Sequence, residues 1–190
     1  MSTELLTRAR QIEIEIEVVT LLQELGINRY PMSVQDLAEG LGIELVKYSS
    51  LSAEERALAK AASDDAFHVR TADFYETRIV LDDRGAYYFR SRFSGAHEIG
   101  HIWLEHREST ADREAEADYF AGYLLVPHPL VLTASAGESV SDLFGVSGQC
   151  ADYAQDQARV RLREGTPRRP HEKWLLDNVV WEGGGLVGRL

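Results

Sequence analysis

Apolar residues recur at helical spacing through the first long segment of the chain, Glu4 to Leu25, on a background rich in glutamate. Between Ile12 and Glu17, isoleucine and glutamate alternate strictly, which taken alone indicates a strand. The segment is long, however, and contains no glycine or proline before Gly26. Helical spacing is kept by the following residues: Leu5, Ala9, Ile12, Ile16 and Val19. We therefore expect a helix here.

Shorter elements follow, separated by glycine, proline and polar residues. Ser33 is a suitable N-cap for a short helix over Val34–Glu39, and Ser52 is suitable for another within Leu51–Ala62. Asp82–Gly85 has the composition of a turn. Apolar and β-branched runs predict three strands: Ile43–Val46, Ala66–Arg70 and Thr77–Leu81.

Longer helical patterns dominate the second half of the chain. They predict helices over Tyr87–Glu105, over Ala111–Val126 with a stop at Pro127, and over Ser139–Arg163. We interpret the residues from Pro167 and Pro170 onward as a tail. Small elements of both kinds predict an α+β fold, in which a small mixed or antiparallel sheet packs on helices.

Composition restricts the class of protein. The chain has 190 residues, a net charge of −11 and a single cysteine, Cys150. No apolar run approaches the roughly 20 residues that a membrane-spanning helix needs, and the first residues do not resemble a signal peptide. With no intramolecular disulfide possible, we expect a cytoplasmic protein in which Cys150 is a buried apolar residue. The acidic balance disfavours nucleic acid as a partner, and we interpret Arg159–Arg169 as a basic balance to it.

One pentapeptide carries most of the chemical information. His97, Glu98 and His101 form the pattern H-E-x-x-H within the predicted helix Tyr87–Glu105. Residues four apart share a helix face, so both histidines can bind one zinc ion while Glu98 acts as general base toward a metal-bound water. The surrounding residues are mostly apolar, so the helix should be buried and its polar face should need a partner.

A third ligand should come from the next helix, because catalytic zinc needs three protein ligands plus water. The candidates there are the following carboxylates: Asp112, Glu114, Glu116 and Asp118. Glu114 and Asp118 share a face, whereas Glu116 points away from it. The E-x-x-x-D spacing resembles the third-ligand helix of thermolysin-like zincins, which implies Glu114 as ligand and Asp118 as support for a ligand histidine. Glu116 is the alternative ligand. Nitrogen and oxygen ligands would also accept manganese or another divalent ion.

Other polar residues receive weaker assignments. An oxyanion-stabilising donor could come from Tyr119, Tyr123 or His128. We interpret His106 as a cation at a helix C-terminus. The remaining histidines are expected to be surface or packing residues: His68, His128 and His171.

The residues from Ser94 to His106 resemble the motif helix of the ImmA/IrrE family of bacterial and phage metallopeptidases. Glu114–Pro127 resembles the family signature E-x-x-A-N-x-F-A-x-x-L-L-x-P, with Asp118 where asparagine is more common. More loosely, the resemblance extends from Ser33 to Leu162. It implies a zincin-like metallopeptidase domain over residues 1–134 and a helical, helix-turn-helix-like extension with a C-terminal tail over 135–190.

The resemblance also implies an activity. Family members cleave, or promote the inactivation of, helix-turn-helix repressors, often encoded beside them, and thereby derepress a prophage, a mobile element or a stress response; others belong to toxin–antitoxin-like modules. We therefore expect a zinc endopeptidase whose substrate is a protein partner, a repressor or an antitoxin-like regulator. The substrate, the trigger and the oligomeric state stay open.

Two alternatives remain at this point. The protein could be a metal-stabilised module that sequesters a repressor without cutting it. It could also be a DNA-binding regulator, with Leu143–Ala154 as a helix-turn-helix core and Gly145 at the turn. Because Asp152 and Asp156 on the second of these helices repel phosphate, we expect no direct DNA binding.

Overall fold

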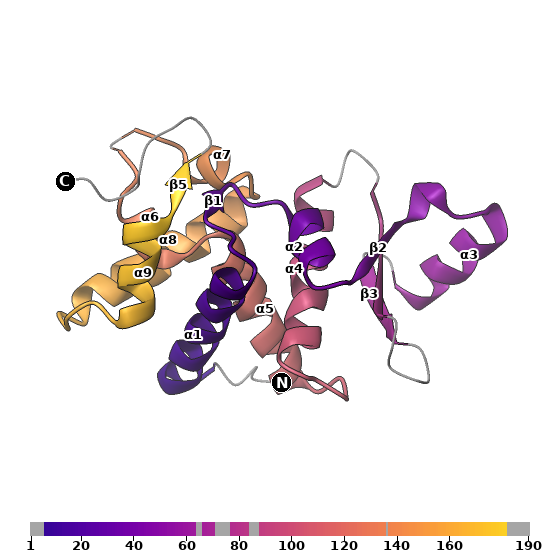
Figure 1. The fold of residues 1–190 in the computed structure, drawn as a ribbon, viewed down its shortest axis with the longest axis horizontal. Coiled ribbons are helices and arrows are strands. Elements are labelled where there is room, and N and C mark those ends of the chain that lie inside the picture. The colour runs from indigo at the N-terminus through magenta and orange to yellow at the C-terminus, as the bar shows by residue number, and fades with distance from the viewer. Residues whose placement is uncertain (1–5, 64–65, 71–76, 84–87, 136, 182–190) are drawn as a thin grey trace.

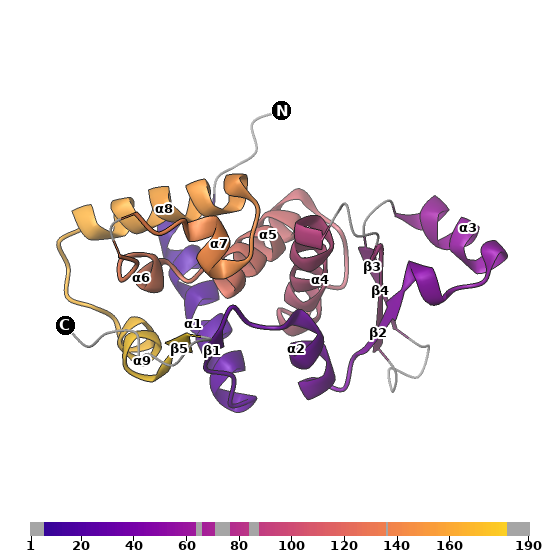
Figure 2. The ribbon, with the colours of Figure 1, turned by 90° about the horizontal axis from the view of Figure 1, so that it is seen from above.

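The computed structural model describes residues 6–63, 66–70, 77–83, 88–135 and 137–181. Figures 1 and 2 show a body of helices at one end of the molecule and a three-stranded sheet at the other, with α2 (Val34–Gly40) and α4 (Tyr88–Trp103) between them. The predicted α+β class, with a small sheet packed on helices, is confirmed. In the part of the chain that the structure describes, no helix has the length and apolar character needed to cross a membrane.

The sheet has the strand order β2-β4-β3, formed by β2 (Glu44–Lys47), β4 (Thr77–Leu81) and β3 (Ala66–Arg70). β2 runs parallel to β4, and β3 runs antiparallel to it. Figures 1 and 2 place α4 on one side of this sheet, and on the other side α3 (Ala53–Ala62), which follows a 3-10 turn, η1 (Tyr48–Ser50). The three strands and both short helices agree with the sequence prediction, including the N-caps Ser33 and Ser52.

Helices α4 and α5 (Ala111–Leu125) pack closely against each other. A Cβ atom at Gly100 would lie 3.0 Å from the ring of Phe120, so glycine permits this approach. Thr110 caps α5 by accepting a hydrogen bond from the backbone N–H of Arg113. The other side of α5 packs on α1 (Arg8–Glu24), which is a helix despite its alternating sequence.

The helical region expected over Ser139–Arg163 consists of α7 (Val140–Phe144) and α8 (Gly148–Arg163). The turn between them lies at Gly145, as the sequence indicated, where the backbone is left-handed with φ 61°. A short helix α6 (His128–Val131) precedes them.

The interpretation of the residues after Pro167 as a tail is wrong for residues 170–181, which form a helix and a strand. Pro170 begins helix α9 (Pro170–Asn178), in agreement with the preference of proline for the first helical turn. Leu175 and Val179 are fully buried, and α9 packs on α1. Beyond α9, β5 (Val180–Trp181) pairs in parallel with β1 (Arg29–Tyr30), which the sequence did not indicate. Buried residues of the first and last helices thus belong to one core, and the division near residue 134 stays a prediction.

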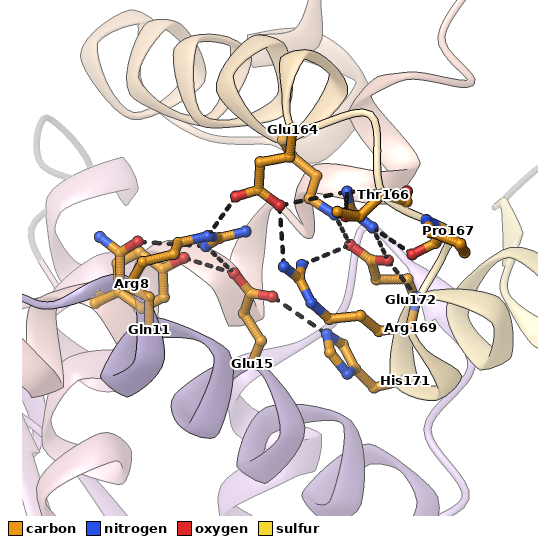
Figure 3. Close-up of polar contacts among 11 residues, drawn as sticks. Arg8, Gln11, Glu15, Glu164, Thr166, Pro167, Arg169, His171 and Glu172 are labelled. Carbon is orange, nitrogen blue, oxygen red and sulfur yellow. Dashed lines mark hydrogen bonds and ion pairs between the residues drawn. The ribbon is translucent and has the colours of Figure 1, made fainter.

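A buried network of charges joins α1 to the C-terminal helices (Figure 3). Glu15 lies on the buried side of α1 with Val18 and Val19 and is 1% exposed. Its carboxylate accepts hydrogen bonds from Arg8 (2.8 Å), from the Tyr119 hydroxyl (2.8 Å) and from His171 (3.2 Å). Arg8 also reaches Glu164 at 2.7 Å. Each buried charge therefore has a partner from another element.

The stretch Arg159–Arg169, interpreted as a basic balance, contributes to this network. Arg161 is buried, and its guanidinium binds both carboxylate oxygens of Glu172, at 2.5 and 2.7 Å. Arg169 contacts Glu164 and Glu172 (Figure 3). These arginines are consequently structural, whereas Arg159 forms an exposed pair with Asp156.

Candidate metal centre

Three side chains converge where α4 faces the start of α5. The Nε2 atoms of His97 and His101 lie 2.9 Å apart. One carboxylate oxygen of Glu114 lies 3.3 Å from the first and 3.5 Å from the second. Tetrahedral zinc with bonds of about 2.0–2.1 Å would hold neighbouring ligand atoms about 3.3 Å apart. The spacing of these three atoms thus matches one ion.

The opposite nitrogen of each histidine is held by a hydrogen bond. His97 Nδ1 lies 2.8 Å from the carboxylate of Asp118. A carboxylate can only accept, so Nδ1 carries the proton and Nε2 of the neutral ring presents its lone pair to Glu114 and His101. His101 Nδ1 lies 2.9 Å from Nδ1 of His106, and His106 Nε2 lies 3.0 Å from Glu116. Because the carboxylate of Glu116 accepts from His106 Nε2, His106 Nδ1 accepts from His101 Nδ1, and His101 Nε2 is left with a free lone pair. Two lone pairs that face each other beside a carboxylate fit a cation between them.

The carboxylates around the two rings favour a positive charge here, which a proton or a metal ion would supply. Burial lowers the pKa of His101, and the neighbouring His97 lowers it further. Burial acts against the charged form of His97 as well, but the hydrogen bond and charge of Asp118 outweigh it and raise that pKa. Burial would raise the pKa of Glu114, yet Ser109, His101 and His97 together lower it. The Ser109 hydroxyl donates to the other oxygen of Glu114 at 2.7 Å, which leaves one oxygen for the ion.

Glu98, the expected general base, has a partner that the sequence did not reveal. Nδ1 of His68 lies 2.6 Å from a carboxylate oxygen of Glu98, and the ring centroids of His68 and His101 are 6.0 Å apart. The interpretation of His68 as a surface or packing residue is therefore wrong. Ala66 and His68 share a face of β3 because alternate residues of a strand do. Recognising that this face meets α4 would have found His68.

His106 and Glu116 also differ from expectation. The helix ends at Trp103, and Glu105 takes a left-handed conformation with φ 56°. The backbone N–H of His106 then donates to the carbonyl of His101 at 2.9 Å, which returns the His106 ring to the site. His106 is buried, and burial lowers its pKa against the opposing effect of Glu116, so it is not the expected helix-end cation. Glu116, the alternative ligand, contacts His106 and Arg10 and lies outside the three-ligand group.

The proposed oxyanion donors lie on the wrong side of α5. Successive helical residues differ by about 100° in direction, so Tyr119 and Tyr123 point away from Glu114. The Tyr119 hydroxyl donates to Glu15, and Tyr123 is packed edge-on against the buried ring of His128. Cys150 is half-buried, and burial raises the pKa of its thiol. None of these four side chains belongs to the three-ligand group.

The comparisons with known proteins agree with this geometry. The Peptidase M78 family model, described as the IrrE N-terminal-like domain, matches residues 39–154, which is more than half of the chain. The match begins in α2 and ends in α8, and so includes the sheet, the motif helix and the helix of Glu114. A comparison with individually curated proteins gives no match. The resemblance inferred from the motif residues is confirmed, and the chain belongs to the ImmA/IrrE family of metallopeptidases.

Proposed function

We propose that this protein is a zinc-dependent endopeptidase that cleaves a protein partner in the cytoplasm. The observation that carries the proposal is the convergence of His97 Nε2, His101 Nε2 and a Glu114 oxygen at 2.9, 3.3 and 3.5 Å from one another. His97, His101 and Glu114 would hold the ion, and Asp118 would orient His97. A bound zinc ion would acidify water and polarise the scissile carbonyl.

Glu98 would carry the proton in this reaction. Its carboxylate takes a proton from the attacking water and delivers it to the leaving amine nitrogen. The hydrogen bond from His68 fixes one oxygen of Glu98, so the other oxygen serves the proton transfer. Glu98 follows His97 directly in α4, and its charge acts on both ligand histidines, which places it beside the ligands.

The proposed substrate is a transcriptional repressor or an antitoxin-like regulator, as the family resemblance implies. In the part of the chain that the structure describes, β3 pairs on one side only, with β4. Its other edge offers backbone groups to an extended peptide. This edge belongs to the strand that carries His68, so a peptide paired there would lie beside Glu98.

Replacing Glu98 with glutamine tests the proposal. Glu98→Gln should keep zinc, because it changes no ligand, but should abolish cleavage. The matched control is Glu24→Gln, which makes the same change at an exposed position near the end of α1. Each zinc-loaded protein is incubated with the proteins of its own cell, and new N-termini are identified by mass spectrometry.

New N-termini that require Glu98 and persist in the control support the proposal. Cleavage that survives Glu98→Gln would contradict the assigned base. If the zinc-loaded protein produces no new N-terminus but retains an intact repressor, the function is sequestration instead. Failure of the purified protein to bind zinc would overturn the metal centre itself.

A further inference from the structure

The far side of His101 is the start of a hydrogen-bonded chain that leaves the site. Its first member is His106, whose Nδ1 lies 2.9 Å from Nδ1 of His101. The second is Glu116, 3.0 Å from Nε2 of His106. The third is Arg10 of α1, which holds both oxygens of Glu116 at 2.7 and 2.8 Å. The chain thus connects a ligand with a residue that lies outside the matched family region.

Hydrogen-bonding rules give this chain a direction. The carboxylate of Glu116 accepts, so Nε2 of His106 donates to it. Nδ1 of the neutral His106 ring must then accept, and His101 Nδ1 must donate. This order leaves the lone pair of His101 Nε2 facing His97 and Glu114. If the chain were broken, the one proton of the neutral His101 ring would no longer be held at Nδ1, and a ring that carries it at Nε2 cannot bind an ion there.

Helix α1 connects this chain of hydrogen bonds with the C-terminal helices. Arg10 also pairs with Glu13 on α1 at 2.9 Å. On the same helix, two residues before Arg10 and five residues after it, Arg8 and Glu15 bind Glu164 and His171 of the C-terminal region (Figure 3). The position of Arg10 therefore depends on how α1 sits against the C-terminal helices.

We propose that His106, Glu116 and Arg10 are positioning residues for His101, through which helix α1 controls how tightly the site binds its metal ion. This inference rests on the proposed metal centre. Partners that orient a ligand histidine contribute about 10–100-fold to metal affinity. His106 is one hydrogen bond away from His101 and Glu116 is two hydrogen bonds away, whereas Arg10 acts only through Glu116.

The test uses the full chain with Glu116→Gln or Arg10→Met, and Arg159→Met as the control. Arg159 pairs with Asp156 on the exposed side of α8, so its replacement also removes an arginine ion pair. Zinc affinity is measured by competition with a coloured chelator. We expect a loss of about 10–100-fold for Glu116→Gln, a smaller loss for Arg10→Met, and no change for the control. Arg10→Lys should lie between Arg10→Met and the unaltered protein, because lysine keeps the charge but not the paired donors.

A second readout detects the tautomer directly. Nitrogen-15 NMR of the metal-free protein should show His101 protonated at Nδ1 alone in the unaltered chain and in the control, and a mixture of tautomers in Glu116→Gln. Thermal unfolding identifies any variant that fails to fold. If Glu116→Gln fails to fold, Arg10→Met tests the inference in its place, because the Arg10 side chain is partly exposed.

The inference is overturned if folded Glu116→Gln or Arg10→Met binds zinc within about twofold of the unaltered protein and keeps its His101 spectrum. That result would leave the metal centre intact. Absence of zinc binding by the unaltered protein contradicts the metal centre, and the inference with it. The two failures are thereby distinguishable.

Discussion

Glu105 occupies a backbone conformation that favours glycine, and its neighbourhood shows why the residue matters. Its φ of 56° reverses the chain directly after α4. The reversal lets the His106 N–H reach the carbonyl of His101. A side chain with a Cβ atom is strained there by roughly 1 kcal/mol. The chain tolerates this strain at the point where His106 joins the site.

Replacing Glu105 with glycine should stabilise the protein by about 0.5–1 kcal/mol, because glycine adopts a left-handed conformation without strain. The free energy of unfolding in urea measures the effect. Glu105→Ala is the matched control, since it also removes the negative charge from the helix end but keeps a Cβ atom. An equal gain from alanine would show that charge, and not backbone strain, is responsible.

At this scale, the sequence predicts best the residues whose relative placement depends on one helix. His97, Glu98 and His101 share a face by spacing alone, and the helix after a short connection offers Glu114. The role of His68 was not predicted, because its contact with Glu98 depends on the order of the strands and on which face of β3 meets α4. The place of His106 in the site was not predicted, because it depends on the left-handed backbone of Glu105, and glutamate gives no sequence signal of that conformation.

Among the elements, the α4–α5 pair decides whether Glu114 can reach the histidines. Gly100 lies at the closest point, where an added Cβ would be 3.0–3.3 Å from three side-chain atoms of Phe120. Phe120 is fully buried and cannot move without disturbing the core. The spacing of the two helices is therefore set at one glycine.

Gly100→Ala should lower the free energy of unfolding by about 1–3 kcal/mol through overpacking. It should also weaken zinc binding, since it moves Glu114 away from His97 and His101. Gly122→Ala is the control within α5: nothing lies within 4 Å of an added Cβ there, so the helix propensity of alanine should raise stability by about 0.5–1 kcal/mol. The overpacking explanation fails if Gly100→Ala is as stable as Gly122→Ala.

Element prediction was good where short signals act locally, as at the Ser33 and Ser52 caps and the β-branched strands. It failed at α9, because Pro170 and the prolines and arginines around it resemble a tail until their partners are known. Arg161 and Glu172 form a pair only when α8 and α9 fold back on each other. The pairing of β1 with β5 is likewise a contact between residues far apart in the sequence, Arg29 with Val180 and Tyr30 with Trp181.

For the molecule as a whole, buried charges determine the response to acid. Burial would raise the pKa of Glu15, but His171, Arg8 and Tyr119 together lower it from 4.5 to about 2. A carboxyl whose pKa is lower in the folded state stabilises that state above its unfolded pKa. This stability is lost as the pH falls from 4.5 to about 2.

When the pH falls from 6 to 3, protonation of the Glu15 carboxylate should therefore lower the free energy of unfolding of the unaltered protein by about 2 kcal/mol. Glu15→Gln removes the titrating group, so this variant should be less stable at pH 6 and should lose less on acidification. Urea unfolding at several pH values measures both slopes. Parallel slopes for the two proteins would contradict the assigned role of Glu15.

The bonds between α1 and the C-terminal helices also have a consequence for how the protein is made. Arg8 and Glu15 find Glu164 and His171 more than 150 residues later in the chain. During translation, all the candidate zinc ligands emerge from the ribosome before these partners exist. Helix α1 can dock completely only after residue 171 has left the exit tunnel, so a nascent chain that already contains every candidate ligand still lacks the contacts that hold α1.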